Sequence, residues 1–173
     1  SDSSAASDVY KRQLLFLLTK VRLVYFYSKM KNAILFAFST ASSAATIPVT
    51  LKTVEEELKV EKSVASFSVP LGATINMDGT AIMQGVATIF IANAYGINLE
   101  ISDFISVIMV ATLASIGTAG VPGVGLIMLA MVLNQVGLPS EGIALIIGID
   151  RLLDMTRTAV NVTGDATISC VVA

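Results

Sequence analysis

Hydrophobic residues along this chain gather in long stretches, which short polar or glycine-rich segments interrupt. Apolar residues dominate from Ala33 to Leu51, from Ser63 to Gly96 and from Phe104 to Gln135. The last stretch, residues 138–173, differs because it also carries a regular series of polar side chains. Apolar stretches of this length are typical of membrane helices, so the pattern predicts an all-α integral membrane protein.

The polar series consists of Asp150, Asp154, Arg157, Asn161 and Asp165. At 100° per residue, their spacings hold the five side chains within an arc of about 80° on one helix. A charged group at the bilayer centre costs roughly 2.5–3.5 kcal/mol on insertion scales. The stripe must therefore face a polar cavity, a partner charge or a cation. The alternative is a soluble amphipathic helix with a solvated face, which the rest of the chain disfavours.

Composition supports the membrane interpretation. The chain is 54% apolar and 14% charged, with a mean hydropathy of +0.79, whereas soluble domains usually carry about 25% charged residues. It contains no histidine, which excludes a His-ligated metal and a His-based proton relay. Its single cysteine excludes an internal disulfide. The net charge of −2 gives no support for nucleic-acid binding, and we expect neither a nucleic-acid partner nor an organic cofactor.

The basic residues predict the topology of the first apolar stretch. None of them lies between Lys62 and Arg151, and lysines flank residues 33–51 on both sides. By the positive-inside rule, both ends of that stretch belong in the cytoplasm. Each arm is about a dozen residues, or roughly 18 Å of helix, which cannot cross a hydrocarbon core of about 30 Å. Residues 24–62 are therefore predicted to form a re-entrant hairpin, with small hydroxyl residues and a proline replacing helix at its tip, 39–48.

The next two segments are also interrupted. Residues 63–97 are predicted to form a span broken at Asn76–Thr80, because the stretch is too long for one straight helix. Residues 98–137 are predicted to form a second re-entrant hairpin that enters from the opposite side, since acidic, lysine-free loops flank it. Its centre, residues 117–125, holds four glycines and a proline. Residues 138–173 are expected to form a last, truncated span.

The two ends of the chain do not share this pattern. Residues 1–13 are small and polar and resemble a translated library adaptor, so we expect a non-native or disordered leader there. Residues 14–23 are expected to be the remnant of a preceding span. The chain also stops inside an apolar run, at Ala173. We therefore expect a fragment of a longer protein, unable to transport by itself.

Two oppositely oriented hairpins and two interrupted spans are typical of secondary transporters, whose broken helices meet near the membrane midplane. Half-helix N-termini attract anions there, and unwound carbonyl groups hold cations. Close helix packing is the alternative explanation for the glycines of either hairpin. Packing alone does not explain why two such hairpins occur together with an acid, Asp78, in a turn that is predicted to be unwound.

Four motifs make the resemblance to a known family specific. The segments SSAATIP, NMDGT, ASIGTAGVPG and DMTRTAVNVTGD resemble the dicarboxylate/amino acid:cation symporters, which include glutamate transporters and neutral amino acid exchangers. The resemblance covers residues 24–173 and corresponds to the C-terminal transport core. It implies no enzymatic activity but sodium-coupled symport of glutamate or aspartate by alternating access. It also implies a multi-pass protein of the cytoplasmic membrane that is homotrimeric at full length.

The resemblance also implies residues that contact the substrate. The position of Arg157 holds the side-chain carboxylate of an acidic amino acid, and that of Asp154 takes its amino group. Arginine's planar fork suits bidentate carboxylate binding. Further matching positions lie in the two tips and on the helices: Ser42, Ser43, Thr80, Val121, Gly125, Thr158 and Asn161.

Sodium positions follow from the same resemblance. One site corresponds to Gly72, Asn76, Asn161 and Asp165, and a second, largely built from carbonyl groups, corresponds to Thr74, Ser115, Ile116 and Thr118. Part of a third corresponds to Asn76 and Asp78, with its other ligands outside this chain. Ligands made only of oxygen suit a hard cation such as Na⁺.

One departure from the family affects the substrate assignment. Some prokaryotic members carry an arginine in the first tip where this chain has Ala41, and animal glutamate carriers carry one at the position of Met155. This chain has neither, but it has Arg151 one turn earlier. We expect Arg151 to supply part of that positive charge; the alternative is a side chain that extends to the external interface.

Three other functions are alternatives. A proton-coupled glutamate or C4-dicarboxylate symporter is the main alternative. An intramembrane aspartyl protease needs two buried aspartates, and Gly164–Asp165 is faintly suggestive, but it would not need Arg157 on the same face. A passive ion channel fits less well, because a glycine-rich tip and an Arg–Asp pair suit stoichiometric binding better than conduction.

Overall fold

The computed structural model describes residues 9, 11, 13, 15, 17–19 and 21–173 of the chain. Its helices are α2 (Leu23–Thr40), α3 (Ser43–Lys52), α4 (Lys62–Ile75), α5 (Asp78–Ala94), α6 (Ile101–Ile116), α7 (Val124–Gln135), α8 (Ala144–Ile147) and α9 (Asp150–Val172), with a π-helical turn η1 (Thr53–Glu57) and a 3-10 turn η2 (Ser140–Ile143). Among the described residues there is no strand, so the predicted all-α class is confirmed.

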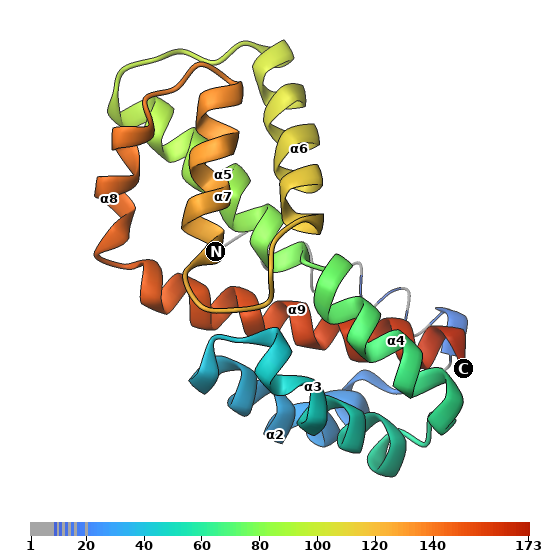
Figure 1. The fold of residues 1–173 in the computed structure, drawn as a ribbon. Helices are drawn as coiled ribbons and strands as arrows, with labels where there is room; N and C mark the ends of the chain where they lie inside the picture. The colour runs from blue at the N-terminus through green and yellow to red at the C-terminus, as the bar shows by residue number, and fades with distance from the viewer. Residues whose placement is uncertain (1–8, 10, 12, 14, 16, 20) are drawn as a thin grey trace.

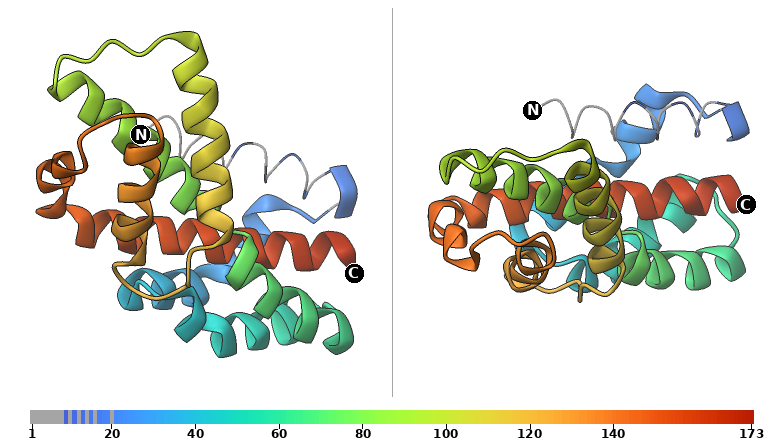
Figure 2. Two further views of the ribbon diagram at one scale, coloured as in Figure 1. Left: turned by 45° about the horizontal axis from the view of Figure 1, so that its top comes forward. Right: turned by 90° about the horizontal axis from the view of Figure 1, so that it is seen from above.

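Helix α9 forms the axis of the molecule. In Figure 1, α2 and α3 lie below it, α4 crosses its C-terminal part, and α5, α6 and α7 rise above its N-terminal half. The views in Figure 2 show the same arrangement, with α9 running through the middle. Its most extensive packing is against α2, α4 and α5. Helices from both halves of the described chain therefore pack against α9.

The first helical hairpin consists of α2 and α3, and its turn is shorter than predicted. The prediction of a non-helical tip over residues 39–48 is wrong: only Ala41, with φ of 51°, and Ser42 lie outside the helices, and Pro48 lies inside α3. The Ser42 side chain caps α3 by accepting from the Ala45 amide at 3.1 Å. Hydroxyl residues are compatible with this helix because they bond back to carbonyl groups four residues earlier, as Thr46 does to Ser42 at 2.7 Å.

A salt bridge joins the two arms at the base of this hairpin. The Lys29 ammonium lies 2.6 Å from a carboxylate oxygen of Glu57. That hydrogen bond, together with the charge attraction, raises the pKa of Lys29 and lowers the pKa of Glu57. Both groups are solvent-accessible, so their contribution to stability is small.

The segment predicted as an interrupted span is indeed broken, although over fewer residues. Helix α4 ends at Ile75 and α5 begins at Asp78, so Asn76 and Met77 alone leave the helical conformation. The residues Asp78–Thr80, which we expected to be unwound, form the first turn of α5. The break places the amide groups at the start of α5 beside the middle of α9.

The second helical hairpin consists of α6 and α7, joined by the glycine-rich residues 117–123. Gly123 has φ of +83° and immediately precedes α7, a left-handed conformation that favours glycine. Helix α6 begins with a capping box, in which the side chains of Glu100 and Asp103 each accept a hydrogen bond from the backbone amide of the other residue. In Figure 1 the linking residues reach down to α9, close to the tip of the first hairpin.

The last predicted span is not one straight helix. After η2 and the short helix α8, the chain bends at Gly148 and Ile149 before α9 begins at Asp150. Asp150 is thus the first residue of α9 rather than a residue in the middle of a helix. The bend allows α8 to pack against η2 while α9 takes a different direction.

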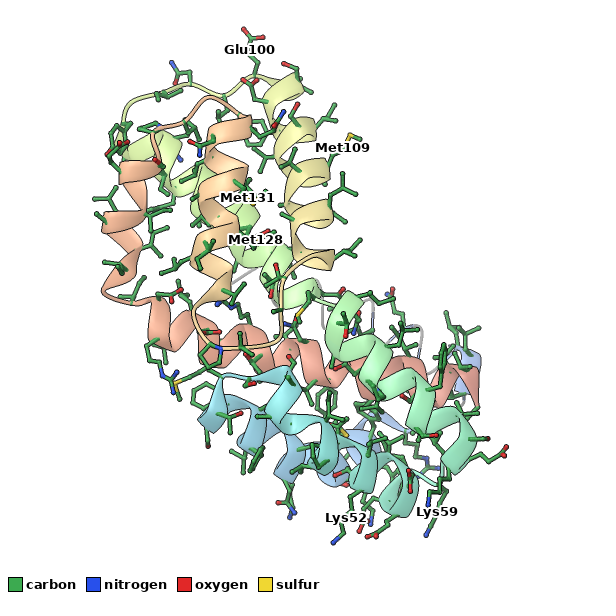
Figure 3. All side chains as sticks on the ribbon, in the orientation of Figure 1. Lys52, Lys59, Glu100, Met109, Met128 and Met131 are labelled. Carbon is green, nitrogen blue, oxygen red and sulfur yellow. The ribbon has the colours of Figure 1, made fainter. Side chains whose placement is uncertain are left out.

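The charged ends of the molecule lie far apart. Figure 3 shows Lys52 and Lys59 at one end, beyond the base of the first hairpin, and Glu100 at the opposite end, above α6. Among the described residues, no helix is both long enough and apolar enough to cross a membrane alone.

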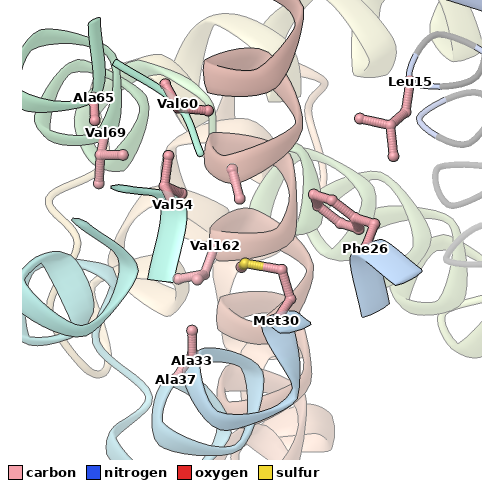
Figure 4. Packing of buried hydrophobic residues seen from close by; sticks show 11 residues of the cluster. Leu15, Phe26, Met30, Ala33, Ala37, Val54, Val60, Ala65, Val69 and Val162 are labelled. Carbon is pink, nitrogen blue, oxygen red and sulfur yellow. The ribbon is translucent and has the colours of Figure 1, made fainter. Parts of the chain in front are cut away.

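Two apolar clusters support the stripe of α9 from either side. The first joins α2, η1 and α4 to the C-terminal half of α9 and includes Phe26, Met30, Val54, Val69 and Val162 (Figure 4). The second joins α5, α7 and α8 and includes Ile91, Leu129, Leu133 and Ile146. The polar residues between these clusters have packed neighbours, which fix the orientation of their side chains.

Candidate functional site

The stripe of α9 is buried along its whole length. Asp150, Asp154, Arg157, Asn161 and Asp165 are between 1% and 8% exposed. Three of them, Asp154, Arg157 and Asn161, lie where the hairpin tips and the α4–α5 break meet. Charges buried to this degree are retained only when they are paired, hydrogen-bonded or bound to a ligand. The contacts of each residue therefore indicate what the site can bind.

Arg157 and Asp154 form the central ion pair. The Nε and Nη2 atoms of Arg157 lie 3.0 and 2.9 Å from the same Asp154 oxygen, Oδ1. The other Asp154 oxygen accepts from the Gly123 amide at 2.8 Å. Asp154 thus connects α9 to the tip of the second hairpin while it neutralises the arginine.

One part of this cluster lacks a close partner. Arg157 Nη1 lies 3.9 Å from Asp150 Oδ1, and neither atom has a hydrogen bond in the described part of the chain. A guanidinium with one free nitrogen is suited to receive a carboxylate from a ligand. The Nη1 group of Arg157, which lies beside the start of α7, can therefore donate a hydrogen bond to a ligand.

The two hairpin tips contact each other directly above this pair. The Gly120 carbonyl accepts from the Ser42 hydroxyl at 2.7 Å and from the Ala44 amide at 3.1 Å. Beneath them lies a cavity of about 10 Å³, lined by residues from both tips, the α4–α5 break and α9: Ala41, Ser43, Met77, Thr80, Thr118, Ala119, Gly120, Val121, Gly125, Asp154, Arg157, Thr158 and Asn161. That volume has room for about one water molecule, so an amino acid can enter only if a tip moves.

A Ser42→Ala variant tests this contact between the tips. It removes both the bond to Gly120 and the cap on α3, so we expect a loss of about 1–3 kcal/mol of unfolding free energy. Chemical denaturation in detergent micelles measures the change. Ser39→Ala is the matched control, because the Ser39 hydroxyl is exposed and bonds only within α2. Equal effects for the two variants would contradict the contact between the tips.

Gly125 is close-packed against the guanidinium of Arg157. A Cβ atom added at Gly125 would clash with Nη1, Cζ and Nη2 of that side chain. Only glycine at this position therefore lets the arginine lie beneath the start of α7 in the observed position. This gives Gly125 a role in positioning the arginine.

We expect Gly125→Ala to displace the Arg157 side chain and to cost about 1–3 kcal/mol of stability, as overpacking does. Gly85→Ala is the matched control, because Gly85 lies in α5 with no atom within 4 Å of an added Cβ. There we expect a gain of up to about 1 kcal/mol, since alanine is the better helix former. Denaturation curves that show the same sign for both variants would contradict this packing.

The α4–α5 break is attached to α9 by Asn161 and Asp165. Asn161 Oδ1 accepts from the Gly79 amide at 2.8 Å, and its amide nitrogen lies 3.3 Å from the Thr80 hydroxyl. Asp165 Oδ1 accepts from Asn76 Nδ2 at 2.9 Å. A Cβ at Gly72 would lie 2.6 Å from the same Asp165 oxygen, so that glycine makes room for the carboxylate. The first predicted sodium group is thus brought together.

The second predicted sodium group is less compact. The hydroxyls of Ser115 and Thr118 bond within their own segment, to Thr112 and Ala114, both at 2.8 Å. Thr74 is exposed and bonds to Pro70 at 3.0 Å. Ile116 is 45% exposed. Within the described residues, the Thr74 hydroxyl makes no hydrogen bond to the second hairpin, so this group stays a prediction.

The remaining predicted residues lie in different surroundings. Thr158 is buried and bonds to the Asp154 carbonyl at 2.8 Å, whereas Val121 is 46% exposed at the second tip. Asp78 makes an ion pair with Lys11 at 3.2 Å. Arg151 is exposed on another side of α9 from the stripe, so its expected contribution of positive charge to the site stays a prediction.

A larger cavity of about 460 Å³ lies between α5, α8 and α9. Its walls are mainly apolar, with Ile82, Val86, Phe90 and Leu145 among the lining residues. A zwitterionic or anionic ligand needs several charged and polar partners close together. The small polar cavity at the hairpin tips has those partners, and we therefore regard it as the candidate site.

Sequence reasoning missed some residues that contribute to this geometry. Lys11 lies in the segment that we expected to be a leader, yet it is 4% exposed beside Asp78. Gly79 has no room for a side chain because a Cβ there would lie 2.5 Å from the Arg157 carbonyl oxygen. Neither proximity follows from local pattern, because the partners are far apart along the chain.

Comparison with known proteins gives a consistent result. The family described as "Sodium:dicarboxylate symporter family" matches residues 10–173. The chain is 50% identical over 137 residues to excitatory amino acid transporter 3 of Mus musculus, covering 79% of this chain and 26% of the relative. It is 46% identical over 151 residues to excitatory amino acid transporter 2 of Homo sapiens, covering 87% and 26%. It is 46% identical over 159 residues to an excitatory amino acid transporter of Caenorhabditis elegans, covering 86% of this chain and 32% of the relative. The chain thus spans about a quarter to a third of these relatives.

Proposed function

This chain belongs to the sodium:dicarboxylate symporter family, and from this membership we propose that it forms the substrate- and cation-binding core of a sodium-coupled carrier for glutamate or aspartate. The family resemblance predicted from the four motifs is thereby confirmed. The observation that carries the proposal is the buried Arg157–Asp154 pair, 2.9 Å apart beneath two touching hairpin tips. We propose that the whole protein is a homotrimer in the cytoplasmic membrane.

The pair suits an acidic amino acid because its two charges match two groups of the ligand. When the ligand enters, its ammonium group replaces the guanidinium as the partner of Asp154, and its side-chain carboxylate becomes the partner of Arg157. Both protein charges therefore stay paired, which avoids the large cost of an isolated buried charge. Polar groups nearby are available for the remaining ligand oxygens, on Ser42, Ser43, Thr80, Thr158 and Asn161, with Val121 and Gly125 covering the ligand from the second tip.

We propose that sodium is the coupling ion, which is transported together with the substrate. Asp165 provides the charge, and the Asn161 side chain and the backbone of Gly72 and Asn76 provide neutral oxygens. A hard cation prefers such oxygen ligands. Because Asn161 also holds Gly79 at 2.8 Å, an ion at this position would order the break that borders the substrate cavity. Binding of ion and substrate would then be coupled, and coupling of this kind is reciprocal.

The membrane arrangement follows the charges and the hairpins. We propose that residues 24–62 and 98–137 are re-entrant hairpins that enter from opposite sides, and that residues 63–97 and 138–173 form the two interrupted spans. The hairpins meet at Ser42 and Gly120. This contact supports a binding site within the membrane that both hairpins share. Lysines at one end of the molecule and Glu100 at the other (Figure 3) support a cytoplasmic location for the base of the first hairpin.

A chimaeric transporter tests this function in a complete protein. Residues 24–173 would replace the matching segment of the mouse excitatory amino acid transporter 3, and labelled aspartate would be followed into liposomes. We expect uptake driven by a sodium gradient and counterflow against unlabelled aspartate inside. An Asp154→Asn chimaera is the control and should show neither.

Other outcomes would assign the alternatives. Uptake driven by a proton gradient without sodium would indicate a proton-coupled carrier, and preference for succinate over aspartate would indicate a C4-dicarboxylate carrier. Flux of label without counterflow would indicate a passive channel. Each of these results contradicts the proposed sodium-coupled transport of acidic amino acids.

A further inference from the structure

The α4–α5 break places a methionine sulfur inside the candidate site. Met77 is 2% exposed and lines the small cavity beneath the hairpin tips. Its sulfur accepts from the Asn161 amide nitrogen at 3.2 Å and from the Thr80 hydroxyl at 3.9 Å. A thioether is only a weak hydrogen-bond acceptor. The orientation of two residues that we propose for substrate binding therefore depends in part on the chemical state of one sulfur atom.

The backbone of Met77 holds this side chain at the cavity. The Met77 carbonyl accepts from the amides of Thr80 and Ala81, both at 3.0 Å, and so begins α5. The cavity has a volume of about 10 Å³, which has room for about one water molecule. An atom added to the Met77 sulfur would therefore occupy space beside the groups that bind a ligand.

Hydrogen peroxide can add such an atom to a thioether. The sulfur lone pair attacks one peroxide oxygen, the S–O bond forms and the O–O bond breaks. The sulfur is thereby oxidised to a sulfoxide, and the other peroxide oxygen leaves as water after proton transfer. The product is polar and chiral, and methionine sulfoxide reductases convert it back to the thioether. Its oxygen is a stronger hydrogen-bond acceptor than the thioether sulfur.

We propose that Met77 is a redox-sensitive residue of this site: hydrogen peroxide oxidises it when the hairpin tips move apart, and the sulfoxide opposes the binding of an acidic amino acid. Two effects act in the same direction. The added oxygen fills part of the cavity, and it binds the Asn161 amide nitrogen, which is then unavailable to a ligand oxygen. The inference rests on the proposed function, because it concerns regulation of the same site.

Peptide mass spectrometry after brief peroxide treatment measures the oxidation of each methionine in the unaltered chain in detergent micelles. Met109 and Met131 of the second hairpin (Figure 3) are 60% and 58% exposed, whereas Met30 is 0% exposed in the first apolar cluster. We expect Met77 to react more slowly than Met109 and Met131 but faster than Met30, because a moving tip exposes it without opening the core. A Met77 rate equal to that of Met30 would overturn the proposal.

Ser42→Ala tests whether the tips control access to the sulfur. The variant removes the hydroxyl that donates to the Gly120 carbonyl at 2.7 Å, so we expect Met77 to oxidise several-fold faster while Met30 keeps its rate. Ser39→Ala, which leaves the contact between the tips intact, should change neither rate. Equal Met77 rates in the unaltered chain and Ser42→Ala would contradict access through the tips. If partial unfolding of Ser42→Ala accelerates Met30 as well, protection of Met77 by bound aspartate decides instead.

Calorimetry with the chimaera measures the effect of oxidation on binding. After peroxide treatment, we expect aspartate affinity in sodium to fall by roughly tenfold or more, the size of one lost hydrogen bond at a buried site. Met77→Leu should keep its own affinity through the same treatment, whereas Met83→Leu, a change in α5, should remain sensitive.

Two results would assign the peroxide effect to other residues. An equal loss of affinity in Met77→Leu would overturn the role of Met77. Recovery of binding with dithiothreitol, which reduces oxidised thiols but not a sulfoxide, would assign the effect to a cysteine such as Cys170 and would also overturn it.

Aspartate together with sodium separates this inference from the proposed function. Bound ligand should hold the tips closed and slow the oxidation of Met77 several-fold, with Met109 unchanged. If aspartate binds and protects Met77, but the oxidised chimaera binds it equally well, the proposed function stands and the role of Met77 is wrong. If aspartate neither binds nor protects while Ser42→Ala still accelerates oxidation, the proposed substrate is wrong and the access of peroxide beneath the tips stands.

Discussion

Replacing Arg157 with cysteine is expected to abolish the binding of aspartate and glutamate while serine or alanine binding appears or persists. The guanidinium lies in the buried cluster with Asp154 and Asp150, and Arg157 lines the cavity beneath the tips. Loss of a charge-assisted pair at a buried position costs on the order of 2–5 kcal/mol, which corresponds to roughly a 30- to 4,000-fold loss of affinity. A neutral amino acid lacks the side-chain carboxylate and does not suffer this loss.

Competition assays with the chimaera measure this change, using labelled aspartate for the unaltered protein and labelled serine for the variant. Arg151→Cys is the matched control, because Arg151 lies on the same helix but is exposed, and it should keep its preference for aspartate. If Arg157→Cys retained that preference and Arg151→Cys lost it, the carboxylate partner would be Arg151. A preference of the unaltered chimaera for neutral amino acids would contradict the acidic substrate itself.

Replacing Asp165 with asparagine is expected to weaken sodium binding and, through it, aspartate binding. Asp165 is 1% exposed and nearly isosteric with asparagine, so the variant removes the charge with little change in volume. Its carboxylate is the only charged ligand that we assign to this ion. Coupling between two sites is typically 1–3 kcal/mol, so we expect aspartate affinity in sodium to fall by about 5- to 150-fold.

The measurement for Asp165→Asn is a titration of aspartate at several sodium concentrations. Glu141→Gln is the control, because it removes one negative charge from an exposed position in η2 and should change neither affinity. Unchanged sodium dependence in Asp165→Asn would show that the ion binds elsewhere, for example at the group of residues around Thr74 and Thr118.

The sequence predicted the strongest periodic feature well. The spacing of the five polar residues placed them on one face of one helix, and all five are buried on α9. The interruption near Asn76 was also correct in kind, although it covers two residues rather than five. These features depend on local pattern, which sequence displays directly.

The errors arose where local pattern permits two structures. Residues 43–48 are rich in small hydroxyl residues, which favour turns but also fit a helix when each hydroxyl bonds back to a carbonyl group, as Thr46 does. The bend at Gly148 and Ile149 was hidden because an apolar run precedes it and the polar series that starts at Asp150 has helical spacing. Helix packing in the folded chain decides such positions.

Proximity between distant parts of the chain could not be predicted from residue types. The contact of Ser42 with Gly120 spans 78 positions, and that of Lys11 with Val160 spans 149. The family resemblance supplied most of the expected site residues, yet it did not indicate Lys11 or the packing of Gly125 on Arg157. Those came only from the three-dimensional arrangement.

The central claim is that the stripe of α9 binds an acidic amino acid together with sodium. The most direct test is the affinity of the purified chimaera for aspartate, measured by calorimetry in sodium chloride and in choline chloride at equal ionic strength. We predict tight binding in sodium and binding weakened by at least an order of magnitude in choline, with serine binding weakly in both. Equal aspartate affinity in the two salts would contradict the claim.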